Sequence, residues 1–205
     1  MLTAFTASLL LITISEIGDK SFFIAMLLSM RHKRRLVFAG VVAALAVMTV
    51  LSVLMGQIFR FLPERYVDWL EITLFLVFGF KLLRDAYCMA SGSCSPTEQK
   101  EAEEAVEHCE AKLKKRSMLA VITQAFVLTF LTEWGDRTQF ATIALAASNN
   151  AYGVTSGAIL GHAVCAAIAV IGGRMVAGRI SERMVTALGG ALFLVFAIVA
   201  GMEMA

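Results

Sequence analysis

Two short acidic stretches interrupt otherwise apolar segments of the chain. Residues 15–21 read Ser-Glu-Ile-Gly-Asp-Lys-Ser, and residues 132–138 read Thr-Glu-Trp-Gly-Asp-Arg-Thr. Each stretch carries two carboxylates three positions apart, namely Glu16 with Asp19 and Glu133 with Asp136. On a helix this spacing places both members of a pair on one face, one above the other. Carboxylate oxygens are the ligands that hard divalent cations prefer, so the four residues are predicted to bind one cation together.

Hydroxyl and amide groups accompany the carboxylates. They belong to Ser15, Ser21, Thr132, Thr138 and Gln139. With them the predicted site contains only hard oxygen donors, which suits Mn²⁺, Ca²⁺ or Mg²⁺ better than Cu⁺ or Zn²⁺. The hydroxyls have an alternative role, which is to bond back to the helix backbone. Of the softer donors His162 and Cys165, the histidine is open to two readings: a packed core residue, or an accessory ligand or proton carrier.

Positive charge follows each aspartate, at Lys20 and Arg137. We expect these two residues to neutralise the carboxylates in part through ion pairs. Four negative and two positive charges leave two negative charges, which one divalent cation or two protons would cancel. Gly18 and Gly135 lie between the carboxylates, where a helix must bend or unwind if it is to offer a backbone carbonyl. The two uncancelled negative charges predict exchange of a divalent cation for protons.

The composition indicates that these stretches lie inside a membrane. Of the 205 residues, 59% are hydrophobic and 17% charged, and the mean hydropathy of +0.76 is outside the range of ordinary soluble domains. A helix needs about 20 mostly apolar residues to cross a bilayer. Six spans are expected, at 3–29, 36–60, 67–87, 117–147, 152–176 and 183–203. Because intramembrane charge is costly, the carboxylates should face the bundle interior or a water-filled path.

The sequence also repeats itself. A shift of 117 residues lays one acidic stretch on the other and Gly40 on Gly157, and one further residue aligns 75–78 with 193–196. The predicted organisation is a first three-helix repeat over 1–87, a cytoplasmic linker over 88–116 and a second three-helix repeat over 117–205. Because three is odd, the second half enters the membrane from the opposite side, which gives the inverted repeat that secondary transporters use.

The placement of charge predicts the orientation. Most of the 18 Lys and Arg residues lie in or beside the loops near 30–35, 81–116 and 174–183, so both termini are expected outside the cytoplasm. No basic region of a signal peptide precedes the first helix, which we expect to be retained. Disulfides are not expected for Cys88, Cys94, Cys109 and Cys165. In residues 101–116 the acidic side chains come first and the basic side chains come last, an order that suits the helix dipole. This order predicts a short solvated helix in the linker.

At the acidic stretches the chain resembles a known family, the small cation/proton exchangers with two Glu-x-Gly-Asp-basic-hydroxyl motifs. This Gdt-type family includes Golgi and chloroplast manganese/calcium transporters, and the chain looks most like its bacterial manganese exporters. The resemblance covers both repeats and implies that the four carboxylates bind the cation, with Ser21, Thr138 and Gln139 as helpers. Phe22 stands where the second repeat has Gln139, so unequal half-sites are expected.

The predicted function is export of Mn²⁺ across the bacterial inner (plasma) membrane in exchange for protons, through a four-carboxylate site. A Ca²⁺/proton exchanger of the same family is the first alternative. A proton-coupled exporter of small solutes and an intramembrane metal-dependent hydrolase are the others. Against an enzyme, the sequence contains no Gly-x-Ser-x-Gly and no His-Glu-x-x-His motif. We expect the lipid bilayer as surroundings, no nucleic-acid partner and no resident cofactor.

Overall fold

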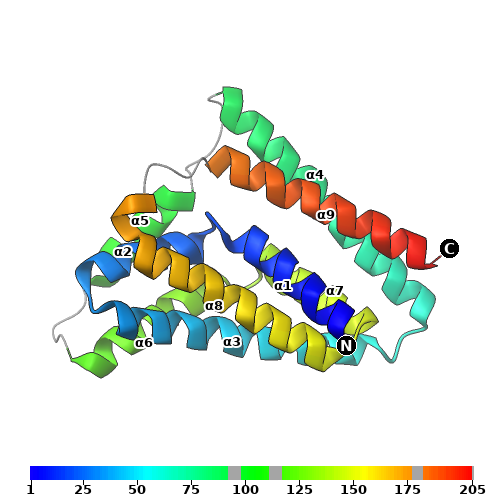
Figure 1. Cartoon of the computed structure of the whole chain (residues 1–205), viewed down its shortest axis with the longest axis horizontal. Helices are drawn as coiled ribbons and strands as arrows, with labels where there is room; N and C mark the ends of the chain where they lie inside the picture. Colours follow the sequence, from blue (N-terminus) through cyan, green and yellow to red (C-terminus); the bar gives the residue numbers. More distant parts are fainter. Residues whose placement is uncertain (92–97, 111–116, 177–181, 205) are drawn as a thin grey trace.

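All the regular secondary structure in the part of the chain that the structure describes is helical, which confirms the all-α prediction. A computed structural model gives the fold of residues 1–91, 98–110, 117–176 and 182–204 (Figure 1). The helices in these ranges are α1 Leu2–Glu16, α2 Lys20–Arg31, α3 Arg34–Phe59, α4 Glu64–Ser91, α5 Glu98–Glu110, α6 Met118–Thr132, α7 Arg137–Ser148, α8 Ala151–Val176 and α9 Glu182–Met204.

Two of the predicted spans are broken helices. The first break separates α1 from α2, and the second separates α6 from α7. Gly18 and Gly135 lie in these breaks with φ of +80° and +81°, a left-handed backbone conformation that an L side chain disfavours. The expectation that the helix unwinds at these glycines is therefore confirmed.

Each aspartate of the motifs caps the helix that follows its break. The Asp19 carboxylate accepts a hydrogen bond from the backbone N–H of Lys20, and the Asp136 carboxylate accepts one from the N–H of Thr138. Aspartate suits this position because it satisfies an N–H group that the helix leaves unpaired. The glutamate and aspartate of one motif thus belong to different segments. The prediction that they share one face of a continuous helix is wrong.

Several helices suit a membrane. α3, residues 151–172 of α8 and residues 183–202 of α9 are long and apolar enough to cross one. The pair α6 and α7 meets the same requirement together and is bent by 77°, which gives a fourth candidate span. The apolar helix α1 has only 15 residues, and charged side chains recur along the longer α4. The molecule is therefore a membrane protein with several apolar helices.

Close helix packing surrounds the two breaks. α8 lies along α1 and α2, and α3 lies along α6 and α7 (Figure 1). Glycine permits this approach, since a side chain at Gly157 would clash with the carbonyl oxygen of Phe5, and one at Gly40 with that of Ile122. Both pairs occupy equivalent positions under the 117-residue shift.

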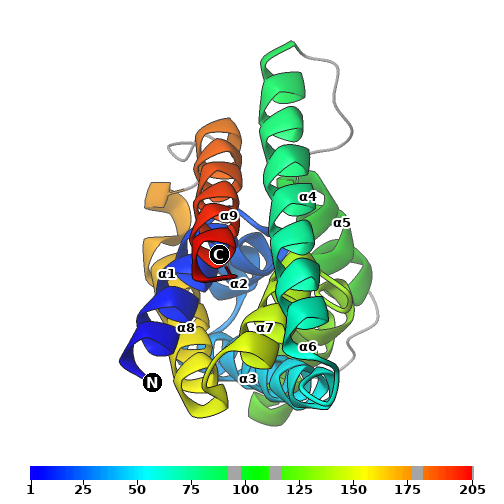
Figure 2. The ribbon, with the colours of Figure 1, turned by 90° about the vertical axis from the view of Figure 1, so that its right-hand side faces the viewer.

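α4 and α9 pack along each other as a second layer (Figures 1 and 2). Their fully buried rings Phe75 and Phe193 meet edge to face with centroids 5.8 Å apart, and these residues belong to the segments that the repeat aligns. α4 also contacts α7, and α9 also contacts α1. α1 begins and α9 ends at the same end of the molecule, opposite α5 (Figure 1).

The linker contains a helix, as predicted, but it is not simply solvated. α5 lies against α2, and its Ala102 and Val106 side chains are each only 1% exposed. Their spacing of four residues puts both on one helix face, which joins the apolar cluster around α2. Cys109 and Cys165 form no disulfide within the described ranges, and Cys94 lies outside them.

Candidate functional site

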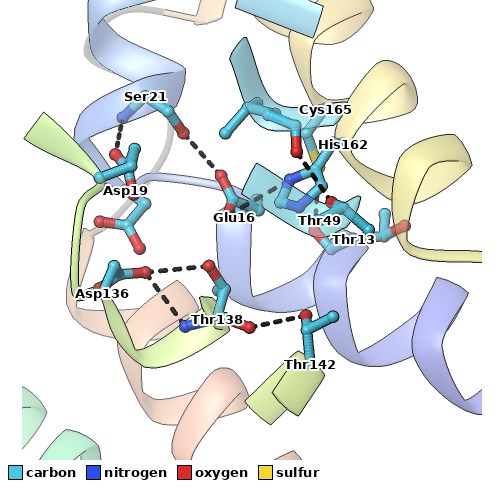
Figure 3. A network of polar contacts seen from close by, with 12 residues as sticks. Thr13, Glu16, Asp19, Ser21, Thr49, Asp136, Thr138, Thr142, His162 and Cys165 are labelled. Carbon is cyan, nitrogen blue, oxygen red and sulfur yellow. Dashed lines mark hydrogen bonds and ion pairs between the residues drawn. The ribbon is translucent and has the colours of Figure 1, made fainter. Parts of the chain in front are cut away.

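The breaks bring carboxylates of both motifs together (Figure 3). Ligand oxygens of Glu16, Glu133 and Asp136 all lie within 4.8 Å of one another. Glu16 is 1% exposed and Glu133 is 2% exposed, while Asp136 is half-buried. Buried carboxylates this close repel one another unless a cation or protons reduce their charge. These three residues, the carboxylate trio, form the candidate cation site.

The start of α2 connects the two motifs. The backbone N–H of Ser21 donates to Glu133 Oε1 at 2.8 Å, and the Ser21 hydroxyl donates to Glu16 Oε2 at 2.6 Å. Helix N-termini favour negative charge, and this one lies beside carboxylates from both halves of the chain. Ser21, a predicted helper, thus holds two of the three carboxylates in place.

Asp19, the fourth predicted carboxylate, lies outside the trio. It is 4% exposed, and its Oδ2 lies 2.5 Å from Nη2 of Arg137. A guanidinium is suited to such a buried pair because it stays charged and presents several donors. The structure therefore places three predicted carboxylates together and the fourth in an ion pair with the other motif.

Lys20 has different partners from Arg137. Its ammonium pairs with Glu101 of α5 and lies 3.9 Å from Glu98 Oε2. We expected both basic residues to form ion pairs with carboxylates of the motifs. Arg137 does so, whereas the ion pairs of Lys20 are with α5. Burial, together with the charge of Asp19, raises the pKa of the Glu98 carboxyl to about 7, against the lowering effect of Lys20.

The predicted helpers of the second motif stabilise its turn. The Thr138 hydroxyl donates to Asp136 Oδ2 at 3.0 Å, which adds to the capping bond from the Thr138 N–H. The side-chain oxygen of Gln139 accepts from the N–H of Gly135 at 2.8 Å. Both residues therefore fix the backbone that presents Asp136.

The hydroxyls that precede the two glutamates differ in role. Thr132 bonds back to the carbonyl of Leu128 at 2.9 Å, which is the alternative considered for hydroxyls from the sequence. The buried Ser15 hydroxyl has no hydrogen-bond partner within the described ranges. Ser15 instead lines a cavity of about 50 Å³ together with Gly18 and Arg137. That cavity reaches Glu98 of α5.

His162 of α8 also reaches the site. Its Nδ1 lies 3.5 Å from Glu16 Oε1, and the residue is 5% exposed (Figure 3). It lines a small cavity of about 10 Å³ together with Glu133, Thr138 and residues of α3. The sequence left its role open because an isolated histidine does not reveal its neighbours. The repeat offered one signal, since the equivalent position in the first half is Leu45.

Comparisons with known proteins agree with a transport site. A family profile described as "Divalent cation/proton antiporter GDT1" matches residues 4–90 and 121–205. The chain is similar to a GDT1-like protein of the cyanobacterium Synechocystis, with 61% identity over 201 residues and 97% of each chain covered. It is 44% identical to the chloroplastic GDT1-like protein 2 of Oryza sativa, covering 96% of this chain and 60% of that one. It is also 42% identical to the chloroplastic PAM71-homolog of Arabidopsis thaliana, over 95% of this chain and 58% of that one. No solved structure gives a significant match.

Proposed function

Because the chain belongs to the GDT1 family of divalent cation/proton antiporters, we propose that it exports Mn²⁺ from the cytoplasm in exchange for protons. The carboxylate trio carries the proposal, since its oxygens lie within 4.8 Å of one another and suit a hard divalent cation. The family consists of transporters and not enzymes, as predicted, so the hydrolase and small-solute alternatives are set aside. The metal ion is cargo, and the proposal includes no resident cofactor.

The charges of the site provide the coupling. Asp19 and Arg137 offset each other as an ion pair, which leaves the trio with up to three negative charges. A divalent cation offsets two of these charges, and protons on the same carboxyls do likewise, so metal and protons compete. When a metal ion or protons neutralise the carboxylates, the change of access from one face of the membrane to the other costs less free energy, because less charge is exposed to the low-dielectric interior. Inward flow of protons can thereby drive the metal outward.

We further propose six spans arranged as two inverted repeats. In this arrangement α1 with α2 forms one broken span and α6 with α7 forms its counterpart, each interrupted at a glycine of positive φ. Gly40 of α3 packs closely against α6, and Gly157 of α8 packs against α1 in the equivalent way. These matching contacts support the internal symmetry. An even number of crossings also agrees with α1 beginning and α9 ending at the same end of the molecule.

The proposed orientation places α5 at the cytoplasmic face of the bacterial inner membrane and both termini outside, by the positive-inside rule. The cavity between Glu98 and Arg137 then lies on the cytoplasmic route to the site. In the described residues, α4 and α9 pack on α7 and α1 but make at most marginal contact with α2 and α6. This one-sided packing supports a conformation accessible from the cytoplasm.

Transport into inverted membrane vesicles tests the function. With an acidic lumen, we expect Mn²⁺ added outside to accumulate and the lumen to become more alkaline. Vesicles that carry the Glu16→Gln variant at equal protein level serve as the inactive control, because the amide keeps the volume but removes a ligand charge. If Ca²⁺ accumulates and dissipates the pH gradient while Mn²⁺ does neither, the calcium alternative replaces the manganese assignment.

A further inference from the structure

We propose that His162 supplies a nitrogen ligand to the transported ion and thereby favours Mn²⁺ over Ca²⁺. This proposal rests on the proposed transport of a divalent cation through the carboxylate trio. It assigns to one residue of α8 a preference that the oxygen ligands of the motifs do not provide.

Two facing atoms in the core carry the proposal. His162 Nδ1 and Glu16 Oε1 lie 3.5 Å apart, in residues that are 5% and 1% exposed. Neither atom has a hydrogen-bond partner among the described residues. Buried polar atoms are normally satisfied, so a facing pair without partners points to a species that is shared between them. Ligand atoms about 2.1 Å from one ion can be up to about 4.2 Å apart, and the observed separation is compatible with joint coordination.

Several polar neighbours of His162 are engaged elsewhere. Around the cavity, the hydroxyls of Thr49, Ser52 and Thr142 each donate to a backbone carbonyl of their own helix at 2.8 Å. On α8 itself, the Cys165 thiol donates to the carbonyl of Thr13. The imidazole therefore faces Glu16 without a competing donor from these groups.

The repeat indicates that the scaffold does not need an imidazole at this place. Leu45 occupies the position equivalent to His162 and lines the same cavity from α3. An apolar side chain thus fills the corresponding space in the first half. The histidine introduces one nitrogen donor into a site otherwise made of oxygen donors, and it does so on one side only.

The donor type explains the direction of the preference. Ca²⁺ takes oxygen ligands, usually six to eight of them at about 2.3–2.6 Å. A neutral imidazole suits transition metals, and Mn²⁺ accepts both imidazole and carboxylate ligands. Loss of the imidazole should therefore weaken Mn²⁺ binding while it leaves Ca²⁺ binding little changed.

The test compares the wild-type protein with His162→Leu, which copies the residue of the first repeat, and with His162→Gln. Binding of Mn²⁺ and of Ca²⁺ is measured on the purified full chain, and elution volume and thermal midpoint report folding. We expect the Kd for Mn²⁺ to rise by about 10- to 100-fold in both variants, as on loss of residues that support a metal site. The Kd for Ca²⁺ should change by less than about threefold, because the oxygen ligands on which Ca²⁺ depends are unchanged in both variants. Cys165→Ala, one turn away on α8, is the matched control and should leave both constants unchanged.

A spectroscopic measurement separates ligation from packing. Nitrogen modulation in the electron spin echo of bound Mn²⁺ should be present in the wild type and in Cys165→Ala and absent in His162→Leu. An equal loss of Mn²⁺ and Ca²⁺ affinity, or unchanged nitrogen modulation in the variant, would overturn the proposal. If the wild type binds Ca²⁺ and Mn²⁺ but transports neither, the proposed function fails while the ligand assignment is still decided by the spectra.

Discussion

Arg137 of the second motif forms an ion pair with Asp19 of the first, with 2.5 Å between Nη2 and Oδ2. The two residues lie 118 positions apart, so this pair joins the halves of the chain at the site. The equivalent basic residue, Lys20, pairs with Glu101 of α5 instead. Two nearly identical motifs therefore contribute differently to the electrostatics of the site.

This difference predicts unequal effects for the two basic residues. Arg137→Gln leaves the buried Asp19 carboxylate without its counter-charge, and removal of one partner of a buried pair costs about 3–5 kcal/mol. We expect its Mn²⁺ uptake to fall more than about tenfold, because an unpaired charge that raises the transport barrier by about 1.4 kcal/mol slows that step about tenfold. Lys20→Gln removes a partly exposed pair, worth about 0–1 kcal/mol, and should retain most uptake. Equal losses in both variants, at equal protein level, would contradict this assignment.

The trio predicts which carboxylates bind metal directly. Glu16→Gln, Glu133→Gln and Asp136→Asn should each abolish most Mn²⁺ binding and transport, because each removes one ligand charge from the group. Asp19→Asn should also impair transport, by leaving Arg137 without its partner. The matched control is Glu104→Gln on the exposed face of α5, which should behave as wild type. Wild-type binding in any two of the trio variants would show that these carboxylates are not a shared site.

The two glycines of the breaks should be sensitive to alanine for a backbone reason. At Gly18 the nearest atom to an added Cβ is 3.7 Å away, and at Gly135 none lies within 4 Å, so steric contacts with neighbours are not limiting. The positive φ at each glycine should make alanine destabilising by about 1–2 kcal/mol. Gly201→Ala in α9, which has space and no positive φ, is the control and should not lower stability. Unfolding in detergent measures the difference, and equal midpoints for all three variants would refute the argument.

The orientation is tested with topology reporters. A reporter that is active only outside the cytoplasm should work when fused within 148–153 and fail when fused within 95–110. This expectation follows from the concentration of Lys and Arg on the linker side. The reverse pattern would invert both the orientation and the proposed direction of transport.

The sequence by itself determined the features that depend on local pattern. Apolar runs predicted membrane helices, the duplicated motifs predicted the residues near the site, and Gly18 and Gly135 predicted where the helices unwind. These features are readable because residue type and spacing act through hydropathy and backbone sterics within a few residues. The apolar stripe of α5, with Ala102 and Val106 four positions apart, is equally local, but the many charged residues of the linker mask it in the sequence pattern.

Only the tertiary structure decided which charged groups meet. Asp19 and Asp136 have the same sequence context, yet one pairs with Arg137 and the other joins the carboxylate trio. Lys20 resembles Arg137 in its motif, but α5 packs against α2 and supplies acidic partners. The sequence left His162 open between a packed core residue and an accessory ligand or proton carrier, and its Nδ1 lies opposite Glu16 only because of where α8 packs. Such pairings depend on side chains from segments far apart in the chain, and electrostatic energy depends on their separation and burial rather than on their order in the sequence.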